Sequence, residues 1–270
     1  MADVIRSFGR ALAAQLSPRM LALSLLPTVL SVVLWGVLLW LGWQPFNDWM
    51  HHQFIEHDLF RTSGSLLSSV GLGMLKTLVV PLLAMLLLLP LMILTALVFV
   101  GVAAMPVVVR HVSTRSFPEL VRKEGGSWWG SVGMALASFA IFVVVFLATL
   151  PLYAVPPLAL AAHVVLWGWL TARVVAYDAL VDHASDEERH TLMRTHRWPL
   201  LLIGMVSGVA GALPGIVWVG GSVLAVVLFP FLAAVSIWLY VVIFIFTGLW
   251  FEHYCLHALR GLRAARGEQE

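Results

Sequence analysis

The chain has 270 residues, of which 61% are apolar and only 11% are charged, and its mean hydropathy is +0.95. Soluble globular domains contain about 45–50% apolar and about 25% charged residues, so this composition excludes an ordinary water-soluble protein. The formal net charge is +2, and the 16 lysines and arginines are scattered between apolar stretches rather than gathered on one face, which argues against a nucleic-acid partner.

The apolar residues form four long runs, at 20–43, 70–109, 131–171 and 200–251. Each run exceeds the ~18 residues that indicate a membrane-spanning helix. The runs are continuous and rich in Leu, Val and Ala, whereas a membrane β-barrel would show short alternating segments. We therefore predict an all-α integral membrane protein whose first partner is the lipid bilayer.

Residues 1–19 precede the first run and combine charge with apolar side chains at helical spacing. Arg6 and Arg10 alternate with Ile5, Phe8 and Leu12. Such a pattern is typical of an amphipathic helix that lies in the headgroup plane, and an ordinary solvated leader is the alternative.

The basic residues predict the topology, because loops on the cytoplasmic side carry an excess of Lys and Arg. Within 44–69 the only basic residue is Arg61, among three acidic ones, so this segment is expected on the trans side. The termini and the remaining loops are expected in the cytoplasm, with the protein in the inner membrane. These cytoplasmic segments are 1–19, 110–130, 172–199 and 252–270.

This topology predicts one membrane domain over 1–270, with single crossings at 20–43 and 70–109. The runs 131–171 and 200–251 begin and end on the same side, so each is expected to form a hairpin. Pro151 with Pro156-Pro157 would turn the first, and Pro214-Gly215 with Gly220-Gly221 the second. The predicted fold is thus two spanning helices plus two hydrophobic hairpins, four to six membrane segments in all.

Two further features of the hairpins carry predictions. The arms 158–171 and 199–213 would be only about 21–23 Å long, so the hairpins could penetrate without fully crossing. Small-residue ladders run through the second hairpin, with Gly204 and Gly208 four residues apart and with Ser207, Gly211 and Gly215 on a neighbouring stripe. Such ladders allow helices to pack closely, and we favour this packing role over contact with a substrate.

The start of the first membrane helix is the main candidate binding site. Ser17 is a good helix cap and Pro18 suits the first helical position, so free N–H groups would lie beside Arg19. Helix N-termini bind anions, and the alternative is that Arg19 only anchors the helix at the interface. Gly71 and Gly73 could present similar backbone donors to an anion, or simply give a flexible entry into the membrane.

The histidines and acidic residues do not predict catalysis. His253 and His257 lie one helical turn apart, and His51, His52 and His57 cluster in the trans-side segment, but no spacing fixes a third ligand, so no metal site is predicted. His163 is the one ionisable residue well inside an apolar run. No nucleotide-binding, nucleophile or paired-carboxylate motif occurs, so we expect neither an enzyme nor a cofactor. The charged segment 186–197 reads as a solvated helix capped by Ser185.

Several segments together resemble the family of the bacterial sulfate permease CysZ and the etoposide-induced membrane proteins. The residues that carry the resemblance are Ser17-Pro18-Arg19 with Pro27, the loop 117–120 closing at Gly125-Gly126, Ala176-Tyr177-Asp178, and 186–197. The resemblance implies two spanning helices and two hairpins that dip from the cytoplasmic side, with sulfate as the solute. Members of the family carry an arginine pair at the turn into the first membrane helix, where this chain has Arg19 alone.

The leading functional hypothesis is therefore a multi-pass permease or channel for a small solute, an oxyanion such as sulfate by resemblance, working as a homo-oligomer. The apolar runs hold almost no ionisable residue of the kind that ion-coupled carriers bury. A passive path lined by N–H groups would need none. The alternative from another class is a non-transporting membrane scaffold or assembly factor.

Overall fold

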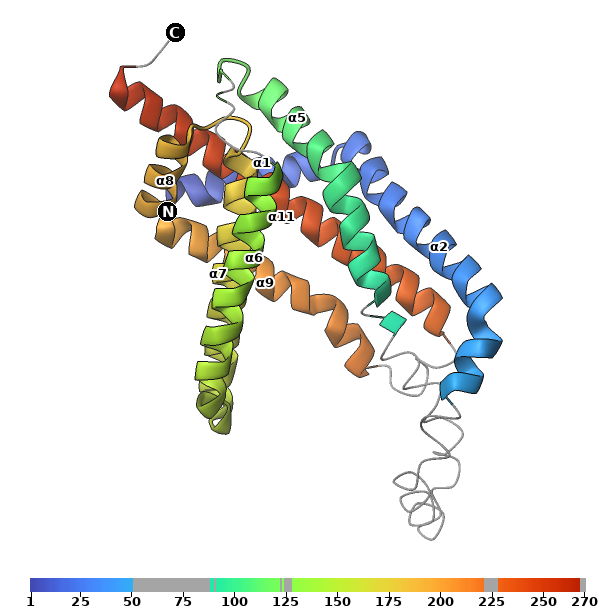
Figure 1. Cartoon of the computed structure of the whole chain (residues 1–270). Helices are drawn as coiled ribbons and strands as arrows, with labels where there is room; N and C mark the ends of the chain where they lie inside the picture. The colour runs from blue at the N-terminus through green and yellow to red at the C-terminus, as the bar shows by residue number, and fades with distance from the viewer. Residues whose placement is uncertain (51–87, 90, 122, 124–127, 221–227, 268–270) are drawn as a thin grey trace. The chain divides into compact units, whose positions relative to one another are not determined.

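The computed structural model describes residues 1–50, 88–89, 91–121, 123, 128–220 and 228–267. All regular elements in these ranges are helices (Figure 1). In chain order they include α1 (Ala2–Gln15), α2 (Pro18–Met50), a helix over 91–99, a π-helical segment (Val100–Ala104), α5 (Met105–Ser116), α6 (Trp128–Thr149), a 3-10 turn (Leu150–Ala154), α7 (Pro156–Leu180), α8 (Asp186–Thr195), α9 (Arg197–Gly220) and α11 (Phe229–Arg266).

Six stretches of helix within the described residues are long and apolar enough to cross a membrane. They are Pro18–Gly42, Leu91–Ser116, Trp129–Leu152, Pro157–Leu180, Arg197–Pro214 and Phe231–Arg266. Most of their large apolar side chains face outward, as expected where lipid rather than water is the solvent. The prediction of an all-α membrane protein is confirmed.

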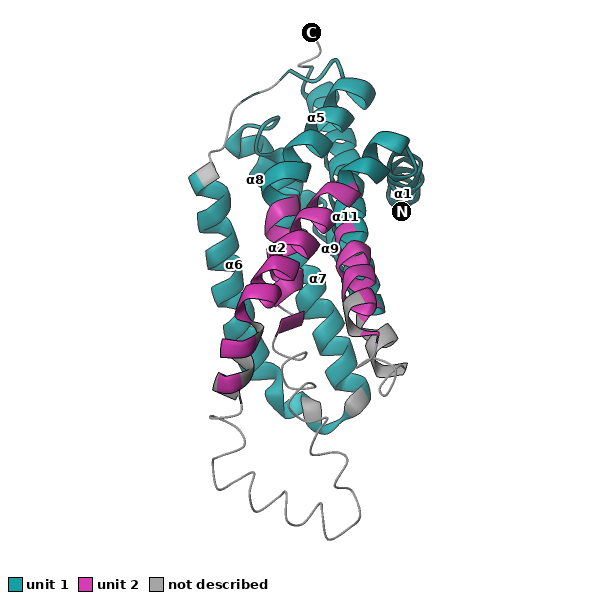
Figure 2. Ribbon diagram, turned by 90° about the vertical axis from the view of Figure 1, so that its right-hand side faces the viewer, with its two compact units in different colours: residues 1–23, 101–213, 242–270 teal, residues 24–100, 214–241 magenta. Residues whose placement is uncertain are grey.

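Contacts divide the chain into two compact units, coloured separately in Figure 2. One unit comprises Met1–Leu23, Gly101–Leu213 and Val242–Glu270, and the other comprises Ser24–Val100 and Pro214–Val241. Helices α2 and α11 contribute residues to both units. The sequence predicted a single membrane domain without this subdivision.

The C-terminal half of α11 forms the core of the first unit. Ile245, Leu249, Phe251, Leu256 and Leu259 are all fully buried. Other side chains of α11 contact α1, α8 and Phe117 at the end of α5, as described below. The polar side chains of Glu252, His253 and Arg263 are buried in the same segment, so α11 is covered on its polar as well as its apolar sides and lies at the centre of its unit.

Helices α6 and α7 form the first predicted hairpin (Figure 1). Pro151 lies in the 3-10 turn between them, and Pro156 opens α7, where its missing N–H costs nothing. The ring of Phe142 lies 4.9 Å from that of Trp167 across the pair. Helix α7 continues to Leu180, so its 25 residues measure about 37 Å. This exceeds the ~30 Å hydrocarbon thickness. The depth of insertion stays a prediction.

The second hairpin differs from the prediction at Pro214. The helix α9 does not end there but continues through this proline to Gly220. Proline inside a helix removes one hydrogen bond and usually kinks the helix without ending it, which accounts for the difference. The turn residues beyond Gly220, from 221 to 227, lie outside the described residues.

The glycine ladder of α9 marks a close crossing with α7. A Cβ atom on Gly204 would overlap the carbonyl oxygen of Gly168, and one on Gly208 would lie 3.9 Å from the Cβ of Trp167. A Cβ on Gly211 would meet nothing within 4 Å. The predicted packing role is confirmed at Gly204 and Gly208 but is wrong for Gly211, since the helices have already separated there.

Candidate functional site

The start of α2 has the capped geometry that its sequence predicted. Ser17 Oγ accepts a hydrogen bond from the backbone N–H of Met20 at 3.4 Å, and Pro18 is the first residue of the helix. Arg19 is exposed and makes no ion pair with any described residue. The guanidinium therefore retains its five N–H donors beside the positive end of the helix.

Gln15, at the end of α1, adds a polar group that the sequence did not single out. Its side chain is only 5% exposed, and neither its carboxamide oxygen nor its nitrogen has a hydrogen-bond partner among the residues that the structure describes. Buried carboxamides are nearly always hydrogen-bonded, so an unsatisfied one points to a water, an ion or a ligand. Only one residue separates Gln15 from Ser17. The α1–α2 joint, defined as Gln15 to Arg19, thus holds a buried carboxamide, a helix N-terminus and an exposed guanidinium within five consecutive residues.

Helix α1 is held on α11 by the indole of Trp250. The indole Nε1 donates to the carbonyl oxygen of Val4 and to Ser7 Oγ, both at 3.1 Å, and the ring of Phe8 packs edge-on against it at 5.0 Å. Residues Val4, Ser7, Ala11 and Gln15 form the buried stripe of the helix. These contacts fix which face of α1 is covered, and they explain why the polar Gln15 is buried.

A neighbouring face of α1, one residue further along than its buried stripe, carries exposed apolar side chains. Its members are Met1, Ile5, Leu12 and Leu16, with Ile5 72% and Leu16 65% exposed, whereas Phe8 on the same face packs in part against Trp250. Arg6 and Arg10 are exposed as well. A helix with apolar side chains on its uncovered face leads directly into the membrane helix α2, so the interfacial position predicted for residues 1–19 remains our proposal for this element.

The other predicted candidates contribute less. Gly71 and Gly73 lie outside the described residues. His253 Nδ1 lies 2.9 Å from the carbonyl oxygen of Leu249, and the ring of His163 lies beside that of Trp167. Among the described residues no three His, Cys, Asp or Glu side chains are arranged to hold a metal ion.

The segment 186–197 is not simply a solvated helix, and that interpretation is wrong for its inner face. Ser185 caps α8 as predicted, with its Oγ accepting from the N–H of Glu188 at 3.3 Å. However, Glu188 is only 1% exposed, and Arg189 is 7% exposed with its guanidinium 4.3 Å from the Tyr177 ring. Charged composition indicates solvation only when the charges are unpaired, and here they are paired.

Glu188 is the centre of a buried ion network. Arg263 Nε donates to its Oε1 at 2.9 Å and Nη2 to its Oε2 at 3.1 Å, a fork that only arginine provides. Lys123 Nζ donates to Oε1 at 3.1 Å, and the backbone N–H of Ser185 donates to Oε2 at 2.8 Å. The network ties α8, α11 and the segment that follows α5 to one carboxylate.

The remaining donors of Arg263 are also used. Nη1 donates to the carbonyl oxygen of Val121 at 3.0 Å, and Nη2 to that of His183 at 2.6 Å. Burial alone would raise the pKa of Glu188, but the hydrogen bonds from Arg263, Ser185 and Lys123 outweigh it and lower the pKa to about 2. The carboxylate therefore stays ionised at every physiological pH.

The sequence of this chain matches a known protein family. A family model described as Sulfate transporter CysZ/Etoposide-induced protein 2.4 matches residues 7–220, which is most of the chain. The chain belongs to this family. Among curated proteins and among solved structures, none matches the chain. Membership of the CysZ family together with the apolar helices fits a membrane transporter-like protein, in a family that is generally of the transporter type rather than enzymatic.

The matched residues of the CysZ family include the α1–α2 joint and α8, but they end before α11. Arg263 therefore lies outside the match. The sequence shows Arg260, Arg263 and Arg266 only as three basic residues of the segment 252–270, and nothing in the local sequence shows that one of them turns inward. A pairing across 75 residues has no local signal.

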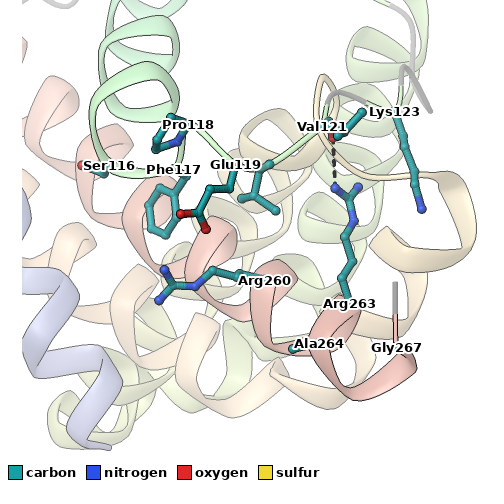
Figure 3. A pocket seen from close by; sticks show the side chains of 11 residues that line it. Ser116, Phe117, Pro118, Glu119, Val121, Lys123, Arg260, Arg263, Ala264 and Gly267 are labelled. Carbon is teal, nitrogen blue, oxygen red and sulfur yellow. Dashed lines mark hydrogen bonds between the residues drawn. The ribbon is translucent and has the colours of Figure 1, made fainter. Parts of the chain in front are cut away.

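A cavity of about 670 Å³ adjoins the ion network in this CysZ-family chain. Figure 3 shows its walls: residues 116–121 and Lys123 on one side, and Arg260, Arg263, Ala264 and Gly267 of the α11 end on the other. We call it the α11-end cavity. It includes the Phe117–Leu120 loop that contributed to the family resemblance.

Proposed function

We propose that the protein is a permease or channel for a small oxyanion of the sulfate class, with the α1–α2 joint as an anion-binding site. The observation that carries the proposal is the Ser17-capped start of α2 with the exposed guanidinium of Arg19, preceded in the chain by the buried carboxamide of Gln15, which has no hydrogen-bond partner among the described residues. A carboxamide N–H, the helix N–H groups and a guanidinium are all donors to an oxyanion. Family membership supports transport rather than a scaffold role.

The test is flux of labelled sulfate into proteoliposomes that hold the purified protein, with chloride and phosphate as comparison ions. Charge-assisted hydrogen bonds contribute about 1.5–3 kcal/mol each, so Arg19→Ala should lower sulfate uptake at limiting concentration by about tenfold or more. Gln15→Leu, which keeps the shape of the side chain, should also lower uptake, since it removes donors.

The control variant is Arg10→Ala, which removes an exposed arginine of the same interfacial segment. Sulfate uptake by this variant should stay within about twofold of the wild-type value, because the charge of Arg10 lies outside the joint and is screened by solvent. Equal, small effects of Arg10→Ala and Arg19→Ala would make Arg19 an interfacial anchor. Absence of any sulfate uptake by folded protein would favour the scaffold alternative.

The topology belongs to the same proposal: inner membrane, both termini cytoplasmic and 44–69 on the trans side. We expect a new thiol at Asn47 or Ser63 to react with an impermeant reagent in intact spheroplasts after Cys255, the single cysteine, is replaced. Protection at both positions would reverse the orientation. We also propose a homo-oligomer, because irregular backbone near the hairpin turns must be covered by protein when it lies inside the membrane. The mass of the protein complex in nanodiscs tests this oligomeric state.

A further inference from the structure

The α11-end cavity carries an inference that is independent of transport, because Arg260, the residue on which it depends, lies beyond the family match. Its lining carries three positive groups, Lys123, Arg260 and Arg263, and one negative group, Glu119. Glu188 neutralises Arg263 through the two-pronged contact described above. Counted over the described lining residues together with Glu188, one net positive charge is left, and Arg260 is an exposed cation of this lining.

The surroundings of Arg260 suit a ligand-binding residue rather than a structural one. Its guanidinium lies 5.6 Å from the centre of the Phe117 ring, which is only 4% exposed and thus a fixed platform. Arg260 itself is exposed and makes no ion pair with any described residue. A guanidinium held over an aromatic ring keeps its edge N–H groups free for an oxyanion.

The volume and the lining of the cavity indicate the class of ligand that fits it. Small-molecule sites measure about 300–1,000 Å³ and combine apolar walls with a few polar groups, so this cavity is larger than a bare inorganic anion requires. Pro118, Leu120, Val121 and Ala264 supply apolar wall. Figure 3 shows Arg260 and Glu119 at one end and Lys123 with Arg263 at the other.

We propose that the α11-end cavity binds an organic phosphate, with Arg260 receiving the phosphate group over Phe117 and the apolar wall receiving the organic part. Arginine matches a phosphate with two parallel N–H donors. The same chemistry is offered by a soluble phosphate monoester and by a phospholipid headgroup. The carboxylate of Glu119 points toward Arg260 and would oppose the bound phosphate (Figure 3).

The experiment titrates glycerol 3-phosphate into the full chain in phosphatidylcholine nanodiscs, with glycerol as the uncharged control, and measures heat of binding. Arg260→Gln should weaken binding about tenfold or more, the value of one charge-assisted hydrogen bond. The matched control is Arg266→Gln, because Arg266 lies in the same helix, pairs with Glu187 at 3.2 Å and does not line the cavity. Glu119→Gln should tighten binding, since it removes the opposing charge.

A second arm identifies the source of the phosphate. In nanodiscs that contain phosphatidic acid, a lipid headgroup would already occupy the site, and no heat of glycerol 3-phosphate binding would be measured. An unchanged heat of binding would identify the ligand as a soluble metabolite. Binding that survives in Arg19→Ala separates this cavity from the α1–α2 joint. The proposal is overturned if no saturable binding occurs in either arm, if Arg260→Gln and Arg266→Gln behave alike, or if Glu119→Gln fails to tighten binding.

Discussion

Replacing Glu188 with glutamine is expected to destabilise the protein by about 3–5 kcal/mol, the usual cost of leaving one buried partner of an ion pair uncompensated. Arg263 is 7% exposed and would keep its charge without the carboxylate that neutralises it. Glutamine at the same position still accepts and donates in the capping box, so the change isolates the charge from the helix cap. The measurement is the midpoint of denaturant-induced unfolding in detergent micelles.

The chain provides a matched control in the neighbouring residue. Glu187 pairs with Arg266 at 3.2 Å, but its side chain is 80% exposed. Glu187→Gln should therefore change stability by no more than about 1 kcal/mol, as is usual for exposed pairs. A double variant, Glu188→Gln with Arg263→Gln, should recover part of the loss because it removes the stranded charge. Similar losses from the two single variants would contradict a buried network.

The same network predicts how stability depends on pH. The pKa of Glu188 is lowered from 4.5 to about 2 in the folded protein, so folding favours the ionised form. Its contribution is complete above about pH 4.5 and is lost as the pH falls toward 2, because the unfolded chain then binds a proton that the folded chain does not. Unfolding midpoints between pH 5 and 3 should fall less steeply in Glu188→Gln than in the wild type.

The helices could be predicted because their signals are local. Apolar runs longer than a bilayer crossing indicate helices whatever their neighbours are, and six such stretches were found. The caps at Ser17 and Ser185 follow from residue type and from positions three residues apart. Helix ends were less accurate: α7 passes the charged Arg173 and reaches Leu180, since one charge near the interface does not end a helix.

The sites could be predicted only in part, because burial depends on contacts distant in sequence. Arg19 and Ser17 were recognised from the helix start that they form. Gln15 was not, because its burial depends on Trp250, more than 200 residues away, which holds the same face of α1. The partners of Glu188 were missed for the same reason: Lys123 lies 65 positions before it and Arg263 lies 75 after it.

Changing Gly204 to alanine is expected to destabilise the protein by about 1–3 kcal/mol, the usual cost of overpacking, although alanine is the better helix former. The added methyl would overlap the carbonyl oxygen of Gly168, a backbone atom that cannot rotate away. In the reverse direction, a Cβ on Gly168 would lie 2.8 Å from the backbone N and Cα of Met205, so neither helix has room to adjust.

Gly211→Ala tests the same helix crossing, because the opposite change in stability is expected for it. No atom lies within 4 Å of a Cβ at that position, so only the intrinsic helix preference of alanine over glycine affects the stability. Alanine is favoured over glycine in helices by up to about 1 kcal/mol, and Gly211→Ala should therefore be neutral or stabilising. Unfolding midpoints of the two variants in micelles should lie on opposite sides of the wild type. If Gly204→Ala were also stabilising, α7 and α9 would not touch at Gly168, and the close crossing would have to be abandoned.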